Sequence, residues 1–383
     1  MTAKQNGAFV PPRRLLLGPG PSMVHPRVLK AMSQPLLGHL DPAFLALMDD
    51  VQAMLRRLFR TNNALTVALS GTGSASMEAA LVNLVEPGDP VVVGVNGVFG
   101  TRMAAVIERC GGKPIRVEAP WGRIVEPQAV EQALDRSGPV KAVAVVNGET
   151  STGVQQPLEE LGALCRRCET LFVVDAVTSL AGVPMEVDRW HIDACYSGTQ
   201  KCLSCPPGLA PLTLSDRALA AIRRRKAPCQ SWYLDCSLIA DYWTESKRAY
   251  HHTAPISMLY GLHEGLRIIE EEGLEARVAR HRRESDALLA GLQALGCAPF
   301  AQEGHRLPTL NAVTLTAGLD EAAVRTGLLQ DHGIEIGGGL GPLKGKIWRI
   351  GLMGESATGR NVKTLLDALE ALLAPRQKGK TRP

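Results

Sequence analysis

Residues 140–177 read VKAVAVVNGETSTGVQQPLEELGALCRRCETLFVVDAV, and they contain a short apolar run, a helical pattern and a second apolar run. The runs at 140–146 and 171–174 are almost continuously apolar, which is typical of strands that are buried on both faces. The segment at 158–168 between them has the spacing of a helix. A helix between two buried strands predicts an α/β fold, with a mainly parallel sheet wrapped by helices.

The same alternation extends through the first two thirds of the chain. Further short β-branched runs lie at 65–69, 90–95 and 114–117, and further helical patterns lie at 44–59, 76–85, 100–110 and 127–134. After Tyr250 the pattern changes to a long helical stretch at 256–295, strands at 310–316 and 346–350, and helices at 321–332 and 361–373. This second part predicts a smaller α+β domain.

The length of 383 residues exceeds what one hydrophobic core usually serves, so two domains are expected. We place an N-terminal extension at 1–14, a large domain at 15–255, a small C-terminal domain at 256–376 and a basic tail at 377–383. The junction at 255/256 follows the change in pattern after Tyr250.

The composition excludes several classes of protein. The chain has 42 basic and 38 acidic residues, a balance too small and too dispersed to predict a nucleic-acid partner. No stretch reaches the roughly 18 apolar residues that a membrane span needs, and the first residues have no apolar segment typical of a secretory signal. Nine cysteines, an odd number, favour free thiols in a reducing compartment. We therefore expect a cytoplasmic protein with no membrane partner.

Two Cys-x-x-Cys pairs raise the question of a metal site. Cys165 and Cys168 lie in a helical pattern, and Cys202 and Cys205 lie far from them along the chain. Paired zinc ligands usually have a closer and more regular spacing. We predict no metal site. In the helical pattern one of the two thiols of Cys165 and Cys168 is expected to face the core, and Cys202 and Cys205 are expected to be packing thiols.

The first candidate binding motif is SGTGS at 70–74, which follows the predicted strand at 65–69 and precedes a helix. Glycines at such a turn let the backbone approach a ligand closely, and the N–H groups at a helix N-terminus suit a phosphate. A simple tight turn explains the motif equally well on its own.

The second candidate is Asp175, which ends the buried strand at 171–174. Open α/β sheets bind ligands at the carboxyl ends of their strands. A carboxylate at the end of an apolar run is costly without a partner, so a cationic ligand group is one interpretation. A helix cap or a loop aspartate is the other.

The third candidate is Lys201 in YSGTQK at 196–201. Alone it would be a surface lysine. Together with Asp175 and the turn at 70–74 it completes the set that pyridoxal 5'-phosphate requires. That cofactor needs a lysine to hold it as a Schiff base, a phosphate site, and an acid that keeps its pyridine nitrogen protonated.

Further motifs lie along nearly the whole chain: LLLGPGPS at 15–22, EAALVN at 78–83, EPGD at 86–89, GETSTG at 148–153, YHHT at 250–253 and RIG at 349–351. With these motifs in this order, the sequence resembles the class V, fold-type I pyridoxal-phosphate-dependent aminotransferases. Within them it is most similar to the alanine–glyoxylate / serine–pyruvate (serine–glyoxylate) aminotransferase group.

The resemblance implies two catalytic residues. Lys201 matches the Schiff-base lysine, which also moves the proton between the α-carbon of the substrate and the cofactor. Asp175 matches the partner of the pyridinium nitrogen. The lysine must be neutral to accept a proton, and a desolvated pocket with a cationic cofactor would lower its pKa.

The resemblance also implies the phosphate site and the assembly. The phosphate would be held by Thr72, Gly73, Ser74 and Gln200. Tyr250 and Thr253 match residues that reach the phosphate of the neighbouring subunit's cofactor, so the resemblance implies a homodimer. Ser74 stands where the animal enzymes carry a histidine, a change that the backbone N–H groups should tolerate.

The remaining implied contacts are with the cofactor ring and the substrate. Phe99 stands where the animal enzymes stack a tryptophan on the ring, and Val177 would pack under it. Thr150 would place its hydroxyl near the ring oxygen and the substrate. Arg349 matches the arginine that grips the substrate α-carboxylate, and Gly20 is expected beside the substrate.

The implied function is transamination by a ping-pong mechanism through the Lys201 Schiff base, with alanine or serine as donor and glyoxylate or pyruvate as acceptor. One carboxylate-binding arginine suits small monocarboxylates. A ureidoglycine–glyoxylate aminotransferase of purine catabolism is an alternative, because it shares the same cofactor contacts.

Two further kinds of protein fit the sequence less well. Class V desulfurases and lyases resemble this chain in the spacing of Asp175 and Lys201. The desulfurases, however, carry a histidine before the lysine and a reactive cysteine on a C-terminal loop. Here Gln200 precedes the lysine, and Cys297 is the only cysteine after residue 236. A nucleotide-binding or interaction protein on the same scaffold would leave Lys201, Asp175 and Arg349 without a common purpose.

Overall fold

The computed structural model describes residues 8–243, 248–315 and 318–373. Four predicted segments lie wholly or partly outside the described residues. They are the basic tail at 377–383, residues 1–7 of the extension, residue 316 of the strand at 310–316 and the last three residues of the small domain.

The larger sheet confirms the predicted α/β fold. Its seven strands lie in the order β2 (Leu65–Gly71), β10 (Gly208–Leu214), β9 (Ala194–Tyr196), β8 (Leu171–Asp175), β5 (Ala142–Val146), β3 (Pro90–Val95) and β4 (Lys113–Glu118). Strands β9, β8, β5, β3 and β4 are parallel, and β10 runs antiparallel to both of its neighbours. Since two antiparallel pairings restore the direction, β2 points the same way as the parallel strands.

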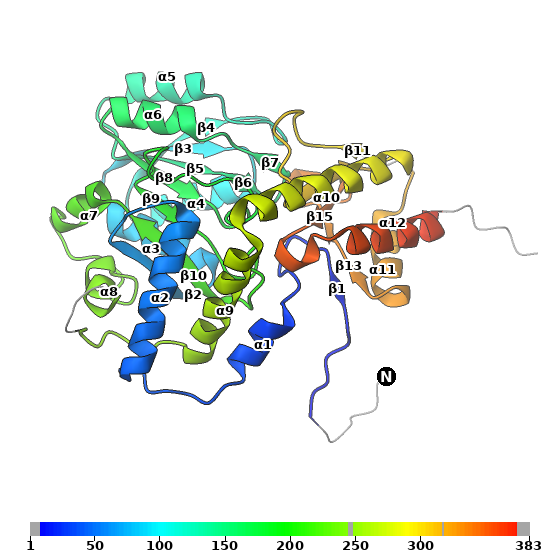
Figure 1. Cartoon of the computed structure of the whole chain (residues 1–383). Coiled ribbons are helices and arrows are strands. Elements are labelled where there is room, and N and C mark those ends of the chain that lie inside the picture. The colour runs from blue at the N-terminus through cyan, green and yellow to red at the C-terminus, as the bar shows by residue number, and fades with distance from the viewer. Residues whose placement is uncertain (1–7, 244–247, 316–317, 374–383) are drawn as a thin grey trace, which may run out of the picture.

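Helices pack around this sheet, as Figure 1 shows for α5 and α6 above the strands and α2 and α9 below them. The helices of this part are α1 (Pro26–Met32), α2 (Pro42–Phe59), α3 (Gly73–Leu84), α4 (Val98–Arg109), α5 (Pro127–Ser137), α6 (Glu159–Arg167), α7 (Asp216–Arg223), α8 (Cys236–Trp243) and α9 (Ile256–Glu272). Most of the strands they cover are apolar on both faces, and the core is rich in Val, Leu and Ala.

A smaller antiparallel sheet has the strand order β11 (Ala298–Pro299), β12 (Leu310–Thr314), β15 (Ile347–Gly351) and β14 (Gly337–Gly338). It is accompanied by α10 (Leu274–Ala294), α11 (Glu321–Asp331) and α12 (Gly359–Leu373). Two short pairs complete the strands: parallel β1 (Leu15–Leu16) with β13 (Ile334–Glu335), and antiparallel β6 (Gly148–Glu149) with β7 (Val154–Gln155). Two 3₁₀ turns lie at Gly341–Leu343 and Gly354–Ser356.

The helical stretch that we predicted at 256–295 is two helices rather than one. Gly273, between α9 and α10, has a φ of +83°, a left-handed conformation that ends a helix and that glycine adopts without strain. Figure 1 shows the chain changing direction at this point.

The two helices also serve different cores. The buried side chains of α9, among them Leu262, join the core of the large sheet, whereas Leu288 and Leu292 of α10 join a second cluster with Trp348. We therefore propose Gly273, rather than the 255/256 junction, as the division between the large and small domains.

None of the described helices combines the length and the apolar character that a membrane span requires.

Candidate active site

Nine of the residues predicted from the sequence line one cavity: Thr72, Gly73, Ser74, Phe99, Thr150, Asp175, Val177, Gln200 and Lys201. They come from segments that are far apart along the chain, at or just after the ends of β2, β3, β5, β8 and β9. These strands all point the same way, so their carboxyl ends meet at one edge of the sheet. The topology thus brings the three sequence motifs together.

Lys201 lies under the N-terminal segment of the chain. Its Nζ donates a hydrogen bond to the carbonyl oxygen of Pro19, and the hydroxyl of Ser22 donates to the Lys201 carbonyl over 2.7 Å. Gly20 has a φ of +112°, and a Cβ at this position would lie 2.5 Å from Nζ. The backbone conformation therefore favours glycine at this position, and a side chain here would displace the Lys201 amine.

The side-chain amine of Lys201 is buried in this position. Burial disfavours the ammonium form and lowers the pKa of Lys201 to about 8, and the positive charge of Arg349 acts in the same direction. A sizeable fraction of the amine is therefore neutral near pH 8, as a proton acceptor requires.

Asp175 is the last residue of β8, and it is only 2% exposed. Burial raises the pKa of its carboxyl group to about 7, although the N–H of Val177 donates to Oδ1 over 2.9 Å and favours the charged form. A cationic ligand group beside Asp175 would stabilise the carboxylate. This geometry fits the protonated ring nitrogen of a pyridine cofactor.

The N-terminus of α3 forms another wall of the cavity. The helix begins at Gly73, and the side chain of its N-cap, Thr72, makes no capping hydrogen bond to the described residues. The buried side-chain oxygen of Gln200 also has no hydrogen-bond partner in the described part of the chain. The uncapped helix N-terminus offers N–H donors to a phosphate group, whereas the unpaired Gln200 atom is an acceptor. The helix N-terminus is therefore the feature by which the residues present fit the phosphate of pyridoxal phosphate.

Arg102 is a cavity residue that the sequence reasoning missed. Its guanidinium carbon lies 4.8 Å from the centre of the Phe99 ring, and Nη1 is 3.5 Å from the Ser74 hydroxyl. Phe99 and Arg102 are three residues apart in α4, so they share one face of the helix. That spacing was the available signal, and it places a positive charge on the phosphate side of the cavity.

Glu149 was also missed, although it belongs to the GETSTG motif. It is fully buried, and its carboxylate accepts hydrogen bonds from the N–H of Phe99 (3.0 Å) and the hydroxyl of Ser151 (2.6 Å). Burial raises its pKa, and these hydrogen bonds offset part of that effect. Glu149 holds the first turn of α4, because its carboxylate accepts hydrogen bonds from the N–H groups of Phe99 and Gly100. Gly97 leaves room for it, since a Cβ there would overlap the Glu149 side chain. Glu149 thereby fixes the place of Phe99.

Arg349 lies on β15, in the small sheet, and is not itself among the residues that line the cavity. Its Nε donates to the Gly338 carbonyl over 2.7 Å, and its Nη1 donates to the Thr150 carbonyl over 3.2 Å. Arg349 is 7% exposed, and burial lowers its pKa from the usual high value of arginine. Arg349 therefore contacts the backbone of Thr150, which is one of the residues that line the cavity.

Tyr250 and Thr253 do not reach the cavity of their own chain. Tyr250 is 59% exposed, and its hydroxyl lies 3.4 Å from that of Thr253. Between them, His252 contacts the hydroxyl of Ser70 over 2.9 Å, just before the turn at 72–74. The segment thus lies beside the phosphate site with these two side chains outside it.

The cysteines near the lysine are buried. Burial raises the pKa of both Cys202 and Cys205 to about 12, so their thiols stay protonated and unreactive. Cys297 is 3% exposed and is not one of the cavity residues.

Known proteins are similar to this chain over nearly its whole length. A family model described as aminotransferase class-V matches residues 14–344. The chain is 42% identical over 380 residues to (S)-ureidoglycine–glyoxylate transaminase of Bacillus subtilis, covering 94% of this chain and 91% of that protein. It is 42% identical over 365 residues to alanine–glyoxylate aminotransferase of Callithrix jacchus, covering 94% and 88%. The crystal structure of alanine–glyoxylate aminotransferase from Nostoc sp. superposes with a TM-score of 0.94 at 47% identity, covering 96% of this chain and 97% of that one.

Proposed function

Because this chain belongs to the class V aminotransferase family, we propose that it transfers the amino group of alanine or serine to glyoxylate or pyruvate by a ping-pong mechanism. The observation that carries the proposal is the convergence of Lys201, Asp175 and the uncapped N-terminus of α3 on one cavity. Glyoxylate is supported by the names of two relatives, an alanine–glyoxylate and a ureidoglycine–glyoxylate enzyme.

Pyridoxal 5'-phosphate is the cofactor of this enzyme, and when bound it supplies the electron sink that makes the α-proton of an amino acid removable. We assign its ring nitrogen to Asp175 and its aldehyde carbon to Lys201. The ring would lie between Phe99 and Val177. Its phosphate would be held by Thr72, Gly73, Ser74, Gln200 and Arg102.

Lys201 and Arg349 divide the work on the substrate. In its neutral form the Nζ of Lys201 takes the α-proton, and as an ammonium it passes that proton on to the bound cofactor in the same half-reaction. In the second half-reaction Nζ carries a proton in the reverse direction, to the α-carbon of the acceptor. The described residues give Arg349 two backbone acceptors, and a guanidinium has five N–H donors, so donors are left for a substrate carboxylate. One such arginine suits a small monocarboxylate better than a dicarboxylate.

Ureidoglycine is the second candidate donor. The Bacillus subtilis transaminase that uses it is 42% identical to this chain, the same value as for the Callithrix jacchus alanine enzyme. A desulfurase is less well supported, because Gln200 stands in place of the histidine and Cys297 is not among the cavity residues.

A donor-by-acceptor activity panel tests the proposal. Purified protein should be yellow, and borohydride should bleach it and modify Lys201. Alanine or serine with glyoxylate should give the highest kcat/KM. Turnover with ureidoglycine alone would favour the second candidate. A colourless protein that is inert to added pyridoxal phosphate would refute the proposed function.

Replacing Arg349 by alanine should lower kcat/KM for the amino donor, mainly by raising KM, because a desolvated carboxylate loses its partner. The loss should correspond to roughly 2–4 kcal/mol of transition-state stabilisation. Arg349→Lys should recover only part of this, since an ammonium cannot form the paired hydrogen bonds. Steady-state kinetics measure both variants, and the cofactor absorbance serves as the control for an intact site. An unchanged KM would show that the substrate anchor lies elsewhere.

We also propose a homodimer and a cytoplasmic location. Several apolar side chains are exposed in this chain, and a second copy would bury side chains of this kind; they are Leu36, Leu37, Leu40, Trp232, Tyr233 and Tyr250. Tyr250 and Thr253 would then approach the partner's phosphate. Sedimentation at assay concentration measures the assembly.

All nine cysteines are free thiols, which supports a reducing compartment and hence the proposed cytoplasmic location.

A further inference from the structure

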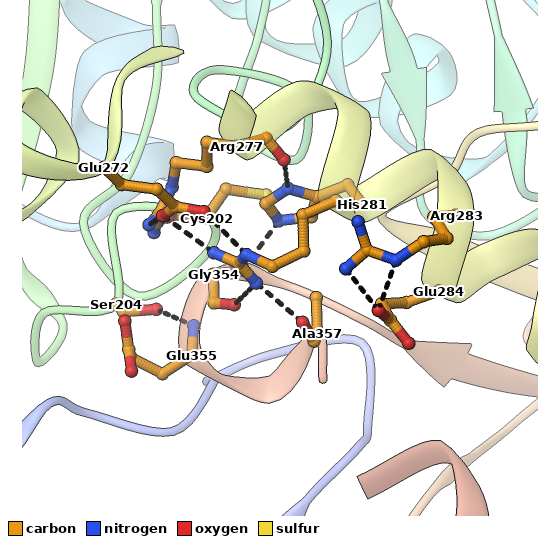
Figure 2. Close-up of polar contacts among 11 residues, drawn as sticks. Cys202, Ser204, Glu272, Arg277, His281, Arg283, Glu284, Gly354, Glu355 and Ala357 are labelled. Carbon is orange, nitrogen blue, oxygen red and sulfur yellow. Dashed lines mark hydrogen bonds and ion pairs between the residues drawn. The ribbon is translucent and has the colours of Figure 1, made fainter. Parts of the chain in front are cut away.

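A cluster of charged and polar side chains lies where the two parts of the chain meet, away from the cavity. It consists of Glu272 at the end of α9 and of Arg277, Arg280 and His281 on the first turns of α10. We call these four residues the α10 clamp. Figure 2 shows Glu272, Arg277 and His281 of this cluster together with Cys202, in the turn that follows Lys201, and Gly354, in the 3₁₀ turn Gly354–Ser356.

Arg277 contacts the turn that follows Lys201. It is 1% exposed, its Nη2 donates to the Cys202 carbonyl over 2.7 Å, and its Nη1 donates to Glu272 over 2.6 Å. Cys202 is the next residue after Lys201, so the guanidinium holds the backbone directly beside the lysine. A buried arginine in this position has no role in the chemistry assigned so far.

Arg280 contacts the 3₁₀ turn Gly354–Ser356 and the residue that follows it. Its Nη1 donates to the carbonyls of Gly354 (2.9 Å) and Ala357 (2.6 Å), and its Nε donates to Glu272 over 2.6 Å. This turn follows β15, the strand that carries Arg349. Burial alone would raise the pKa of Glu272, but hydrogen bonds and charges from Arg280 and Arg277 outweigh it and lower that pKa. One carboxylate therefore joins the two arginines.

His281 completes the connection. The N–H of Gly354 donates to its Nε2 over 2.9 Å, so this nitrogen is unprotonated, and Nδ1 therefore carries the hydrogen that it donates to the Arg277 carbonyl over 2.7 Å. Burial lowers the pKa of His281 to about 3, which keeps the ring neutral. Gly354 is required here, since a Cβ would overlap the Ser204 hydroxyl and lie 2.7 Å from the Cys202 carbonyl.

We propose that the α10 clamp positions Lys201 and Arg349 relative to each other, with Arg277 acting on the lysine side and Arg280 on the arginine side. The inference rests on the proposed function, which gives these two residues their roles. Lys201 belongs to the large sheet and Arg349 to the small one, and the clamp bonds to the turn that follows each. Small displacements of a reacting group are costly, so fixed turns matter for the rate.

Three matched substitutions on one helix test the proposal: Arg277→Lys, Arg280→Lys and Arg283→Lys. Arg283 is the control, because its side chain is 66% exposed and pairs only with Glu284 among the described residues. Each variant is assayed as the holoenzyme for kcat, for KM of the amino donor, for the pH midpoint of the cofactor absorbance, and for Tm.

Arg277→Lys should lower kcat on the order of 10- to 100-fold and shift the pH midpoint, with KM nearly unchanged. Arg280→Lys should mainly raise KM, and Arg283→Lys should match the parent in all four quantities. A purely structural cluster would lower Tm in the first two variants and leave kcat, KM and the midpoint at the Arg283→Lys values, which would overturn the proposal.

Two further features keep the test decisive. If Arg277→Lys does not fold, Glu272→Gln removes the shared carboxylate at nearly constant size. It should change kcat and KM in the same directions by smaller factors, and unchanged values would overturn the proposal equally. Failure of this inference can also be told apart from failure of the proposed function. If only the inference fails, the parent and Arg283→Lys still catalyse transamination.

Discussion

Replacing Lys201 with alanine is expected to lower turnover by a factor on the order of 10⁵ or more, the size of effect seen when a covalent catalytic group is removed. The substitution deletes the covalent anchor for the cofactor and the group that carries the α-proton. Its buried position and its pKa of about 8 make this amine suited to both tasks. Among the described residues that line the cavity, Lys201 is the only one with a side-chain amine.

The measurement is kcat together with cofactor content. Lys201→Ala should still bind pyridoxal phosphate, because Asp175 and the α3 N-terminus remain, but borohydride should no longer fix the cofactor to the protein. Lys344→Ala, at an exposed position, is the control and should keep the parent activity. Turnover by Lys201→Ala close to that of the control would remove the lysine from the mechanism.

Replacing Asp175 with asparagine should lower kcat on the order of 10³-fold, because the partner charge of the ring nitrogen is lost at almost constant shape. The same change should stabilise the cofactor-free protein above pH 7. The folded pKa of Asp175, about 7, lies above its ordinary value of 3.8. The native state therefore loses stability as the pH rises from about 4 through 7, by roughly 4 kcal/mol at most.

Urea unfolding of the cofactor-free protein at pH 5 and pH 8 checks this sign. Asp175→Asn should exceed the parent in free energy of unfolding at pH 8 and differ much less at pH 5. Asp135→Asn, at an exposed position on α5, should show no such pH-dependent gain. If Asp175→Asn were less stable than the parent at pH 8, the Asp175 carboxylate would be stabilised by its neighbours even in the cofactor-free protein, and the prediction would be wrong.

The sequence predicts the cavity well where a side chain ends a buried strand. Asp175 and Lys201 follow apolar runs, and parallel topology alone brings such ends together. Glu149 and Arg102 could not be assigned in this way. The role of Glu149 depends on how closely Gly97 approaches it, and the role of Arg102 depends on the rotation of α4 about its axis. Neither quantity can be read from a local pattern.

The break between α9 and α10 shows the same limit. The helical pattern at 256–295 continues through Gly273, because a single glycine interrupts neither charge nor apolar spacing. The turn there depends on which core each half can reach. The α10 clamp was also invisible, since Cys202, Arg277 and Gly354 are joined only by the folded chain.

The pairing of β1 with β13 has a consequence for the order of events during synthesis. Leu15 pairs with Ile334, and the Leu17 carbonyl accepts a hydrogen bond from Gly351 over 2.8 Å, so the segment that covers Lys201 is anchored by residues more than three hundred positions later. Proteins generally begin to fold from the N-terminus while they are being made. Here the segment at 15–17 pairs with residues of β13 and β15, so a nascent chain cannot close its catalytic centre before those strands have been made.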